Sequence, residues 1–231
     1  MKILLIETAT QVCSAAIAED GTIVASRRSE QPNAHSTRLP LFVKELIAGS
    51  VDAVCVSSGP GSYTGLRIGV STAKGICYAL GKPLVAVPTL LSMARLFYRQ
   101  HPGYDGLVCP MIDARRMECY TMIANRDSIL RDTAADIITE GFYDSWLDNS
   151  AVTFIGDGAE KTRPLLSSHP NAHYDNSFVV DAEGMLETAI QYLHDSKVED
   201  VAYFEPFYLK DFVAKKSVVH GLRPNTETDG E

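Results

Sequence analysis

Apolar and polar residues follow a regular order over the first hundred positions of the chain. Short runs rich in Ile, Val, Ala and Leu occupy 3–7, 13–18 and 22–27, and the turn Glu19-Asp20-Gly21 separates the last two. Apolar runs bounded by turn residues are typical of strands. The chain is therefore expected to open with three consecutive strands that pair as a meander.

Strands and helices then alternate up to position 99. The elements predicted by the spacing of apolar residues are a helix at 37–48 capped by Ser36, a strand at 51–57, a helix at 64–80 ended by Gly81, a strand at 84–87 and a helix at 89–99. The order β-β-β-α-β-α-β-α is that of an α/β half-domain with a mixed sheet.

The pattern starts again, more sparsely, after the loop 101–104. The elements predicted there are strands at 107–112, 118–124 and 152–155, a short helix at 142–147 and a helix at 182–193. We therefore expect an N-terminal lobe at 1–103 and a smaller C-terminal lobe at 104–214. The polar segment 215–231 is expected to be a flexible tail.

The helix expected at 64–80 carries two apolar stripes. The stripe that must pack on the sheet contains Leu66, Gly69, Val70, Ala73, Ile76, Cys77 and Leu80. The second stripe contains the small or apolar residues Ile68, Thr72, Gly75 and Ala79. Glycine inside a helix costs about 1 kcal/mol relative to alanine, so Gly69 and Gly75 indicate that another backbone comes close. That neighbour is either a helix of the same chain or a protein that docks on an exposed patch.

Residues 59–69, with the sequence GPGSYTGLRIG, lie between a predicted strand and this helix. Glycines beside a proline allow a tight reversal, and amides at a helix N-terminus attract anions, so the segment is a candidate phosphate loop. The glycine spacing is G-x-G-x-x-x-G, however, and no Gly-Lys-Ser/Thr follows it. Spacing alone therefore favours a plain tight turn.

Charge and cysteine content narrow the classes of function. The formal net charge is −8, which leaves few cations for phosphate contacts and disfavours a direct RNA-binding module. The five cysteines include no C-x-x-C pair, which argues against disulfide frameworks and zinc ribbons; Cys13, Cys55 and Cys77 are expected to be buried. Glu7 interrupts the first apolar run, and no run of about 20 apolar residues follows, so we expect a cytoplasmic protein without a signal peptide or membrane span.

Further motifs occur in a fixed order along the chain. They are Ile6-Glu7-Thr8-Ala9-Thr10, Asn33-Ala34-His35-Ser36-Thr37-Arg38-Leu39, Ala73-Lys74-Gly75, Met111-Ile112-Asp113-Ala114-Arg115-Arg116, Ile155-Gly156-Asp157-Gly158-Ala159 and Pro206-Phe207-Tyr208-Leu209-Lys210. Together with 59–69 they resemble the TsaB (YeaZ) family, relatives of the glycoprotease-like TsaD transferases. The resemblance covers residues 1–210. It implies an α/β fold of the ASKHA (actin-like, hexokinase-like, ribonuclease H-like) superfamily, duplicated into two lobes with mixed sheets flanked by helices.

The resemblance also implies a function. A member of this family is a non-catalytic subunit of bacterial tRNA N6-threonylcarbamoyladenosine synthesis that binds and activates a TsaD-like transferase, with a TsaE-like ATPase as third partner. The helices 37–48 and 64–80 are then the surface that pairs with the transferase or, in a homodimer, with a second copy. The residues expected at this interface are Arg38, Leu41, Glu45, Ile68, Thr72, Gly75 and Ala79. The tRNA is reached only indirectly, and the chain is expected to hold no cofactor of its own, since ATP and metal belong to the partner.

Histidines decide whether the chain is expected to be catalytic. The TsaD branch carries His-x-x-x-His on a helix, whose two imidazoles converge on a metal. By resemblance, the equivalent positions here hold Thr89 and Met93, which cannot replace imidazoles. The spacing recurs at His169 and His173, where the sequence favours a solvated turn over a metal site. His35 is expected to be a capping or surface residue. We therefore expect no catalytic residue and no metal site.

Three carboxylates and one arginine are candidates for contact with a nucleotide or another anion. Glu7 and Asp113 end the first strand of each lobe, where, by resemblance, ASKHA ATPases hold metal-bound water or phosphates. Residues 8–10 contain no glycine, which leaves less room for phosphate. Asp157 is expected to cap a helix after its strand. Arg115 follows Asp113 and either binds an anion or forms a salt-bridged strand exit.

Two other classes of function stay open at this point. A free-standing ASKHA small-molecule kinase or ATPase requires its own nucleotide site. A metallopeptidase-like protein requires a bound metal.

Overall fold

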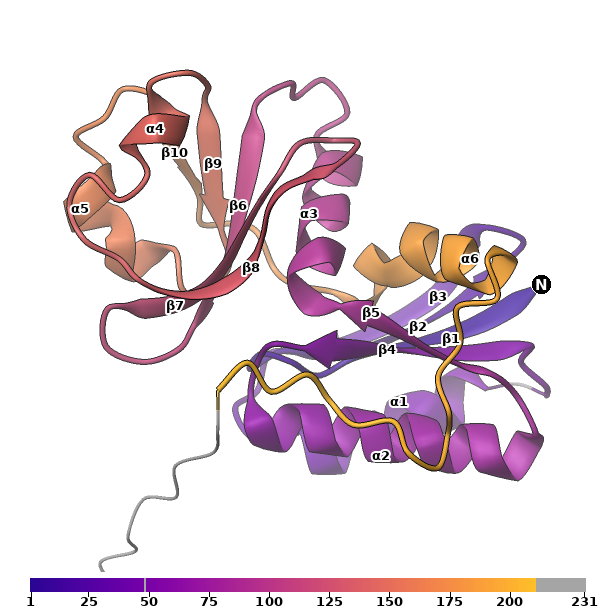
Figure 1. Cartoon of the computed structure of the whole chain (residues 1–231). Helices are drawn as coiled ribbons and strands as arrows, with labels where there is room; N and C mark the ends of the chain where they lie inside the picture. The colour runs from indigo at the N-terminus through magenta and orange to yellow at the C-terminus, as the bar shows by residue number, and fades with distance from the viewer. Residues whose placement is uncertain (48, 211–231) are drawn as a thin grey trace, which may run out of the picture.

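The computed structural model describes residues 1–47 and 49–210 (Figure 1). Position 48, the predicted end of the first helix, and the predicted tail 215–231 lie outside the described residues. The described chain forms two lobes, each built on one five-stranded sheet.

The first lobe is built on a mixed sheet with the strand order β3-β2-β1-β4-β5. Its strands are β1 (Lys2–Glu7), β2 (Cys13–Glu19), β3 (Thr22–Ser29), β4 (Ala53–Gly59) and β5 (Leu84–Pro88). The first three pair in antiparallel fashion, whereas β1, β4 and β5 pair in parallel. Because β1 lies in the middle of the sheet, Ile3, Leu4, Leu5 and Ile6 are all buried, which explains the uninterrupted apolar run.

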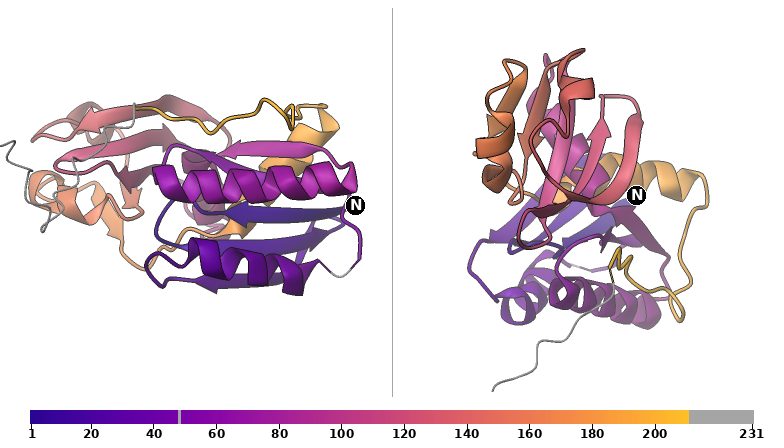
Figure 2. Two further views of the ribbon diagram at one scale, coloured as in Figure 1. Left: turned by 90° about the horizontal axis from the view of Figure 1, so that it is seen from below. Right: turned by 60° about the vertical axis from the view of Figure 1, so that its left-hand side comes forward.

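Helices cover both faces of this first sheet. They are α1 (His35–Leu46), α2 (Tyr63–Leu80), α3 (Thr89–Gln100), the 3-10 helix η2 (Ala182–Met185) and α6 (Leu186–His194). Helices α1 and α2 lie side by side on one face, whereas η2 and α6 pack on the other (Figures 1 and 2). Helix α3 connects this sheet to the second lobe. No described helix combines the length and the apolar composition that crossing a bilayer demands.

The second lobe repeats the arrangement of strands. Its strands are β6 (Leu107–Asp113), β7 (Glu118–Ala124), β8 (Ile129–Ile137), β9 (Val152–Ile155) and β10 (Ala172–Asp175), in the order β10-β9-β6-β7-β8. Helix α3 packs on one face of this sheet. The other elements are α4 (Asp144–Leu147), η1 (Glu160–Thr162) and α5 (Arg163–Leu166). Each sheet places its third, second, first, fourth and fifth strand in that order, which confirms the duplicated α/β fold.

The second sheet has as many strands as the first, although only three strands were predicted there. Strands β8 and β10, which lie at the two edges of the sheet, were not predicted. Strand β8 has the sequence ILRDTAADI and buries little beyond Asp136. An edge strand has fewer neighbours to bury its side chains, so its apolar alternation is weak.

The helix predicted at 182–193 was assigned to the wrong lobe. Ala182, Met185 and Ala189 pack against Ile3 and Leu5 on the first sheet. Because α1 and α2 lie on the opposite face, this apolar surface needs a second cover, which the returning chain supplies. The last part of the range 104–214 therefore belongs in space to the first lobe, whereas the division at residue 103 stays a prediction.

Helix α1 begins earlier than predicted. Its N-cap is Ala34, and Ser36 lies within the first turn. His35 is buried, and its Nε2 lies 2.9 Å from the carbonyl oxygen of Thr10. The expectation of a capping or surface histidine was therefore wrong, since this side chain ties α1 to the loop after β1.

All five cysteines are buried, which confirms the prediction for Cys13, Cys55 and Cys77. Burial raises the pKa of Cys13 and of Cys77 to about 11. Their thiols therefore remain protonated and act as small apolar side chains.

Candidate functional site

The glycine turn between β4 and α2 is filled by the chain's own backbone. The Ser62 amide donates to the Ala9 carbonyl at 2.6 Å, and the Ser62 hydroxyl caps α2 by accepting from the Gly65 amide at 3.2 Å. A Cβ at Gly61 would overlap the Ala9 carbonyl, and a Cβ at Gly65 would overlap that of Thr8. These glycines therefore admit the β1–β2 loop, and the structure favours a tight turn over a phosphate loop.

The two glycines inside α2 have different surroundings. A Cβ at Gly69 would overlap the Thr8 hydroxyl, so this glycine allows α2 to pack against the end of β1. At Gly75, a Cβ would meet no described atom within 4 Å beyond the local helix backbone. A neighbour within the chain therefore accounts for Gly69 and not for Gly75.

The expected interface residues lie on the adjacent helices α1 and α2 (Figure 2). On α1, Arg38, Leu41 and Glu45 are exposed, and Glu45 accepts from the Arg27 guanidinium at 2.8 Å. On α2, Ile68 and Thr72 are half-buried, whereas Gly75 and Ala79 are exposed. Their use as an interface stays a prediction.

Two larger side chains on α2 add apolar surface that sequence analysis missed. Tyr78 is 86% exposed, and Leu80, which was expected to pack on the sheet, is 42% exposed. The helical period alone did not reveal this, because Leu80 is the last residue of α2 and lies beyond the well-covered part of the sheet-facing stripe.

The two positions equivalent to the histidines of the transferase branch make structural contacts. The Thr89 hydroxyl is buried and accepts from the Gly59 amide at 3.1 Å. Met93 is 1% exposed, and a Cβ at Gly156 would lie 2.5 Å from the Met93 methyl. One side chain thus secures the end of β4, and the other fills the space beside the turn after β9.

Histidines elsewhere do not assemble a metal site in the described chain. His169 lies 3.3 Å from the Asp148 carboxylate, and its Nδ1 accepts from the Asn171 amide at 3.2 Å. His173 is exposed on β10. Residues 1–47 and 49–210 contain no group of three or more His, Cys, Asp or Glu side chains suited to a metal ion.

Glu7 is a fully buried carboxyl at the end of β1. Its Oε1 accepts from the Ala9 amide at 2.6 Å and from the Ser57 hydroxyl at 2.8 Å. Its Oε2 has no hydrogen-bond partner among the described residues. Burial, with a smaller contribution from the Asp181 carboxylate, raises the pKa of Glu7 to about 7. Glu7 is therefore enclosed by protein, and its contact with a nucleotide or another anion stays a prediction.

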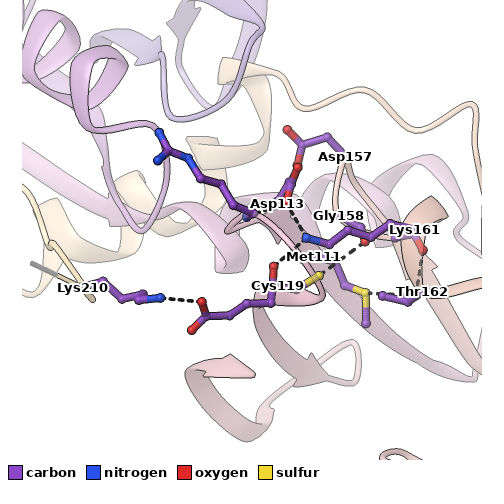
Figure 3. Close-up of polar contacts among 11 residues, drawn as sticks. Met111, Asp113, Cys119, Asp157, Gly158, Lys161, Thr162 and Lys210 are labelled. Atoms are coloured by element: carbon purple, nitrogen blue, oxygen red, sulfur yellow. Dashed lines mark hydrogen bonds and ion pairs between the residues drawn. The ribbon is translucent and has the colours of Figure 1, made fainter. Parts of the chain in front are cut away.

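The other three candidates are joined by hydrogen bonds at the end of β6, where Figure 3 labels Asp113 and Asp157. The Asp113 amide donates to Asp157 Oδ1 at 3.0 Å, and Asp113 Oδ1 accepts from the Arg115 amide at 2.7 Å. Lys161 forms an ion pair with Asp113 and donates to the Glu118 carbonyl at 2.6 Å. Glu7 contacts a different set of residues, so no contact joins all four candidates.

Asp157 does not cap a helix, contrary to the expectation from the sequence. Its side chain accepts from β6 and does not cap a helix, because η1 begins after Ala159. Although Asp157 retains exposed surface, the protein packed round its carboxyl raises its pKa, and the Asp113 charge adds to this shift. Lys161, which balances both carboxylates, was missed, since a single lysine after a turn gives no sequence signal.

The β6–β7 turn holds two arginines in an uncommon backbone conformation. Arg115 has φ 75° and Arg116 has φ 52°, and both residues are exposed. The Arg115 backbone amide binds Asp113, and no ion pair of the Arg115 guanidinium is found among the described residues, so the salt-bridged strand exit is not confirmed. Anion binding through its guanidinium stays a prediction.

Two open surface hollows lie away from these candidates. One, of about 280 Å³, is lined by residues that include Glu140, Asp144 and His169. The other, of about 350 Å³, lies beside Tyr98 and Arg126. Neither is lined by Glu7, Asp113, Arg115 or Asp157.

Comparison with known proteins gives consistent matches. A profile of the family described as "TsaD: tRNA N6-adenosine threonylcarbamoyltransferase" matches residues 22–218. The chain is 31% identical to the tRNA threonylcarbamoyladenosine biosynthesis protein TsaB of Escherichia coli (strain K12), over 94% of this chain and 98% of that protein. It is 28% identical to the protein of the same name from Bacillus subtilis (strain 168), over 97% and 93%. The solved structure of YeaZ from Pseudomonas aeruginosa has a TM-score of 0.78 at 26% identity, over 90% of this chain and 99% of that one.

The glycines of α2 provide a matched pair of substitutions. Gly65→Ala is expected to lower the free energy of unfolding by about 1–3 kcal/mol, because the new Cβ overlaps the Thr8 carbonyl. Gly75→Ala is expected to raise it by about 0.5–1 kcal/mol, because alanine is the better helix former and the site is open. Urea unfolding of both variants measures the difference. Equal effects of the same sign would contradict the packing described for Gly65.

Glu7 should make stability depend on pH. Its folded pKa lies above its unfolded value of 4.5, so its contribution to the free energy of unfolding is present in acid and is lost as pH rises through about 7. The loss amounts to about 3 kcal/mol. Glu7→Gln should remove this part of the slope when urea unfolding is measured at about pH 5 and about pH 8. Comparing slopes cancels the contribution of Asp181, whose pKa burial also raises. Identical slopes in both proteins would show that Glu7 does not titrate in this range.

Proposed function

The chain belongs to the TsaB (YeaZ) family, and we therefore propose that it is a non-catalytic activating subunit of the bacterial machinery that forms N6-threonylcarbamoyladenosine in tRNA. Its proposed partners are a TsaD-type transferase, which performs the transfer, and a TsaE-type ATPase. The protein acts in the cytoplasm, where thiols stay reduced; its five buried free cysteines are consistent with that compartment.

The observation that carries the non-catalytic role is the environment of Thr89 and Met93. The resemblance equates these positions with the metal-binding histidines of the transferase branch. Here neither side chain offers an imidazole, and both are buried in contacts with Gly59 and Gly156. A metal at this place would have to displace packing that joins the two lobes, so metal and ATP are assigned to the partner.

The glycine turn supports the same assignment. A phosphate at the start of α2 would need the space that the Thr8 and Ala9 carbonyls occupy. In the second lobe, the Gly158 amide already donates to the Met111 carbonyl at 3.1 Å. In both turns, backbone amides donate to other groups of the chain and are therefore not available to phosphate oxygens. This disfavours a free-standing kinase or ATPase.

The docking surface is assigned to the exposed side of α1 and α2. Leu41, Tyr78 and Leu80 present large apolar side chains there, and Gly75 lets another backbone approach. Arg38 and Glu45 supply charged groups, the usual composition of an interface rim. Through this surface the subunit binds the competent conformation of the transferase more tightly than the alternative, and so shifts the partner toward it. When the transferase is absent, a second copy of the chain occupies the same surface.

The chain approaches tRNA only through its partners. Its net charge of −8 gives little support to phosphate contacts of its own. The nucleic acid is therefore expected to be held by the transferase.

Charged substitutions on α2 test the docking surface. Gly75→Glu and Ala79→Arg should abolish capture of the TsaD-type transferase from the same organism, because each places a charge in the apolar contact. Gln191→Glu is the matched control, because Gln191 is an exposed residue of α6 on the opposite face of the sheet. This variant should bind the transferase normally. Circular dichroism verifies that all three variants stay folded. Retained capture by both α2 variants would remove these positions from the interface.

The isolated chain should lack independent catalytic equipment. Calorimetry with Mg-ATP is expected to give weak or absent binding, and elemental analysis is expected to find no stoichiometric zinc or iron, because the two glycine turns and the Thr89–Met93 positions are filled. Adding the purified chain to the transferase should increase threonylcarbamoyl transfer to tRNA. Robust turnover by the chain alone, insensitive to the transferase, would overturn the proposal.

A further inference from the structure

The chain after α6 runs back along the first lobe and ends against the second (Figures 1 and 2). The Glu199 amide donates to the Leu84 carbonyl at 2.8 Å on the edge of β5. The Phe207 amide donates to the Ser58 carbonyl at 2.7 Å near the end of β4. We call residues 199–210 the strap.

Helix α2 holds the strap through two side chains. The Lys74 ammonium donates to the Ala202 carbonyl at 3.1 Å and to the Phe204 carbonyl at 2.9 Å. Nearer the start of the helix, the rings of Tyr63 and Tyr208 lie 4.9 Å apart. The helix that carries the proposed docking surface therefore also fixes the path of the strap.

The far end of the strap is bound to the second lobe. Lys210 forms an ion pair with the Glu118 carboxylate on β7 (Figure 3). The Glu118 carbonyl accepts from Lys161, which is paired with Asp113 on β6. The strap thus ends on the β6–β7 hairpin, at the cluster of charges described above.

The strap also lies directly against the β4–α2 turn. A Cβ at Gly59 would lie only 2.6 Å from the Phe207 carbonyl oxygen, so this glycine gives the strap backbone its place. Gly59 in turn donates to the Thr89 hydroxyl at the start of α3. The strap consequently contacts α2, which carries the docking surface, and the end of β4, which is bonded to the start of α3 at the lobe junction.

We propose that the strap transmits docking on α2 to the second lobe. This inference rests on the proposed function, because it assigns regulation to the same docking surface. Lys74 precedes exposed Gly75 and lies four residues before Tyr78, so both lie within one turn of the side chain that grips the strap. A partner that changes this grip alters the position of the strap, and Lys210 carries the change to the β6–β7 hairpin.

Hydrogen exchange of the full chain, followed by mass spectrometry, tests this connection. Lys74→Met keeps the aliphatic stem and removes both hydrogen bonds, so exchange should rise about tenfold in the strap and should also rise at 113–120. Lys210→Gln should speed exchange at 205–210 by up to about fivefold, the range of an exposed ion pair. Lys44→Met, on exposed α1, is the control and should change neither segment.

The charge reversal Lys210→Glu with Glu118→Lys should restore slow exchange that either single substitution loses. Faster exchange in the strap of Lys74→Met without any change at 113–120 would overturn the proposed transmission. Unchanged exchange in Lys210→Gln would show that the ion pair does not hold the strap.

Addition of the transferase separates this inference from the proposed function. In the wild-type chain, docking should change exchange at 113–120, whereas in Lys210→Gln the transferase should still protect α2 and the change at 113–120 should disappear. Protection of α2 with no response at 113–120 in the wild type would overturn the strap and leave the docking proposal intact. If the transferase protects nothing, the docking proposal fails, and the comparison of isolated variants decides whether the strap connects the lobes.

Discussion

The close approach of the β1–β2 loop to the start of α2 is the constraint on which the rest of the first lobe depends. It requires that Gly61 and Gly65 lack side chains, because the carbonyls of Ala9 and Thr8 occupy the space of a Cβ. Once the loop is in place, Glu7 is enclosed and the Thr10 carbonyl meets His35 of α1. The same contact fixes α2 against the sheet and leaves its opposite side open. The glycines of segment 59–69, which suggested a phosphate loop, thus allow two backbone segments to pack closely.

At the junction of the lobes, close packing is made by side chains of α3. Thr89 and Met93 begin successive turns of α3, the helix that packs on the second sheet and leads out of the first. Met93 reaches the turn after β9, where Gly156 has φ 95° and no room for a Cβ. Packing that joins lobes through apolar contact is difficult to reconcile with a metal centre at the same atoms. The lobe junction is therefore suited to holding the two lobes in one arrangement, which fits the proposed activating role.

Elements with a well-buried face could be predicted from the sequence more accurately than contacts between distant residues. Central strands such as β1 and the amphipathic α2 were predicted nearly to the residue, because their apolar patterns reflect cover on one or both faces. Edge strands β8 and β10 were missed, whereas the edge strand β3, which is also largely exposed, was predicted from its apolar run, so exposure alone does not explain the misses. The sequence indicated that Gly69 and Gly75 had a close neighbour, yet only the structure distinguished them, since the partner of Gly69 is Thr8, sixty-one positions earlier in the chain. Glu7 and Asp113 hold equivalent strand ends, but their different environments depend on Ser57 and Lys161, which no local motif predicts.

The two sides of α2 fit the proposed role of a subunit that activates a partner. Docking costs less free energy when the surface is already held in its bound shape. On α2 that rigidity comes from the inner side, where Gly65 and Gly69 allow direct contact with Thr8, and from the strap, which crosses the helix at Lys74. The outer side keeps Gly75 open and Tyr78 exposed. Substitutions that loosen the inner side should therefore weaken docking without touching the interface, because a helix free to move must be ordered again when the partner binds.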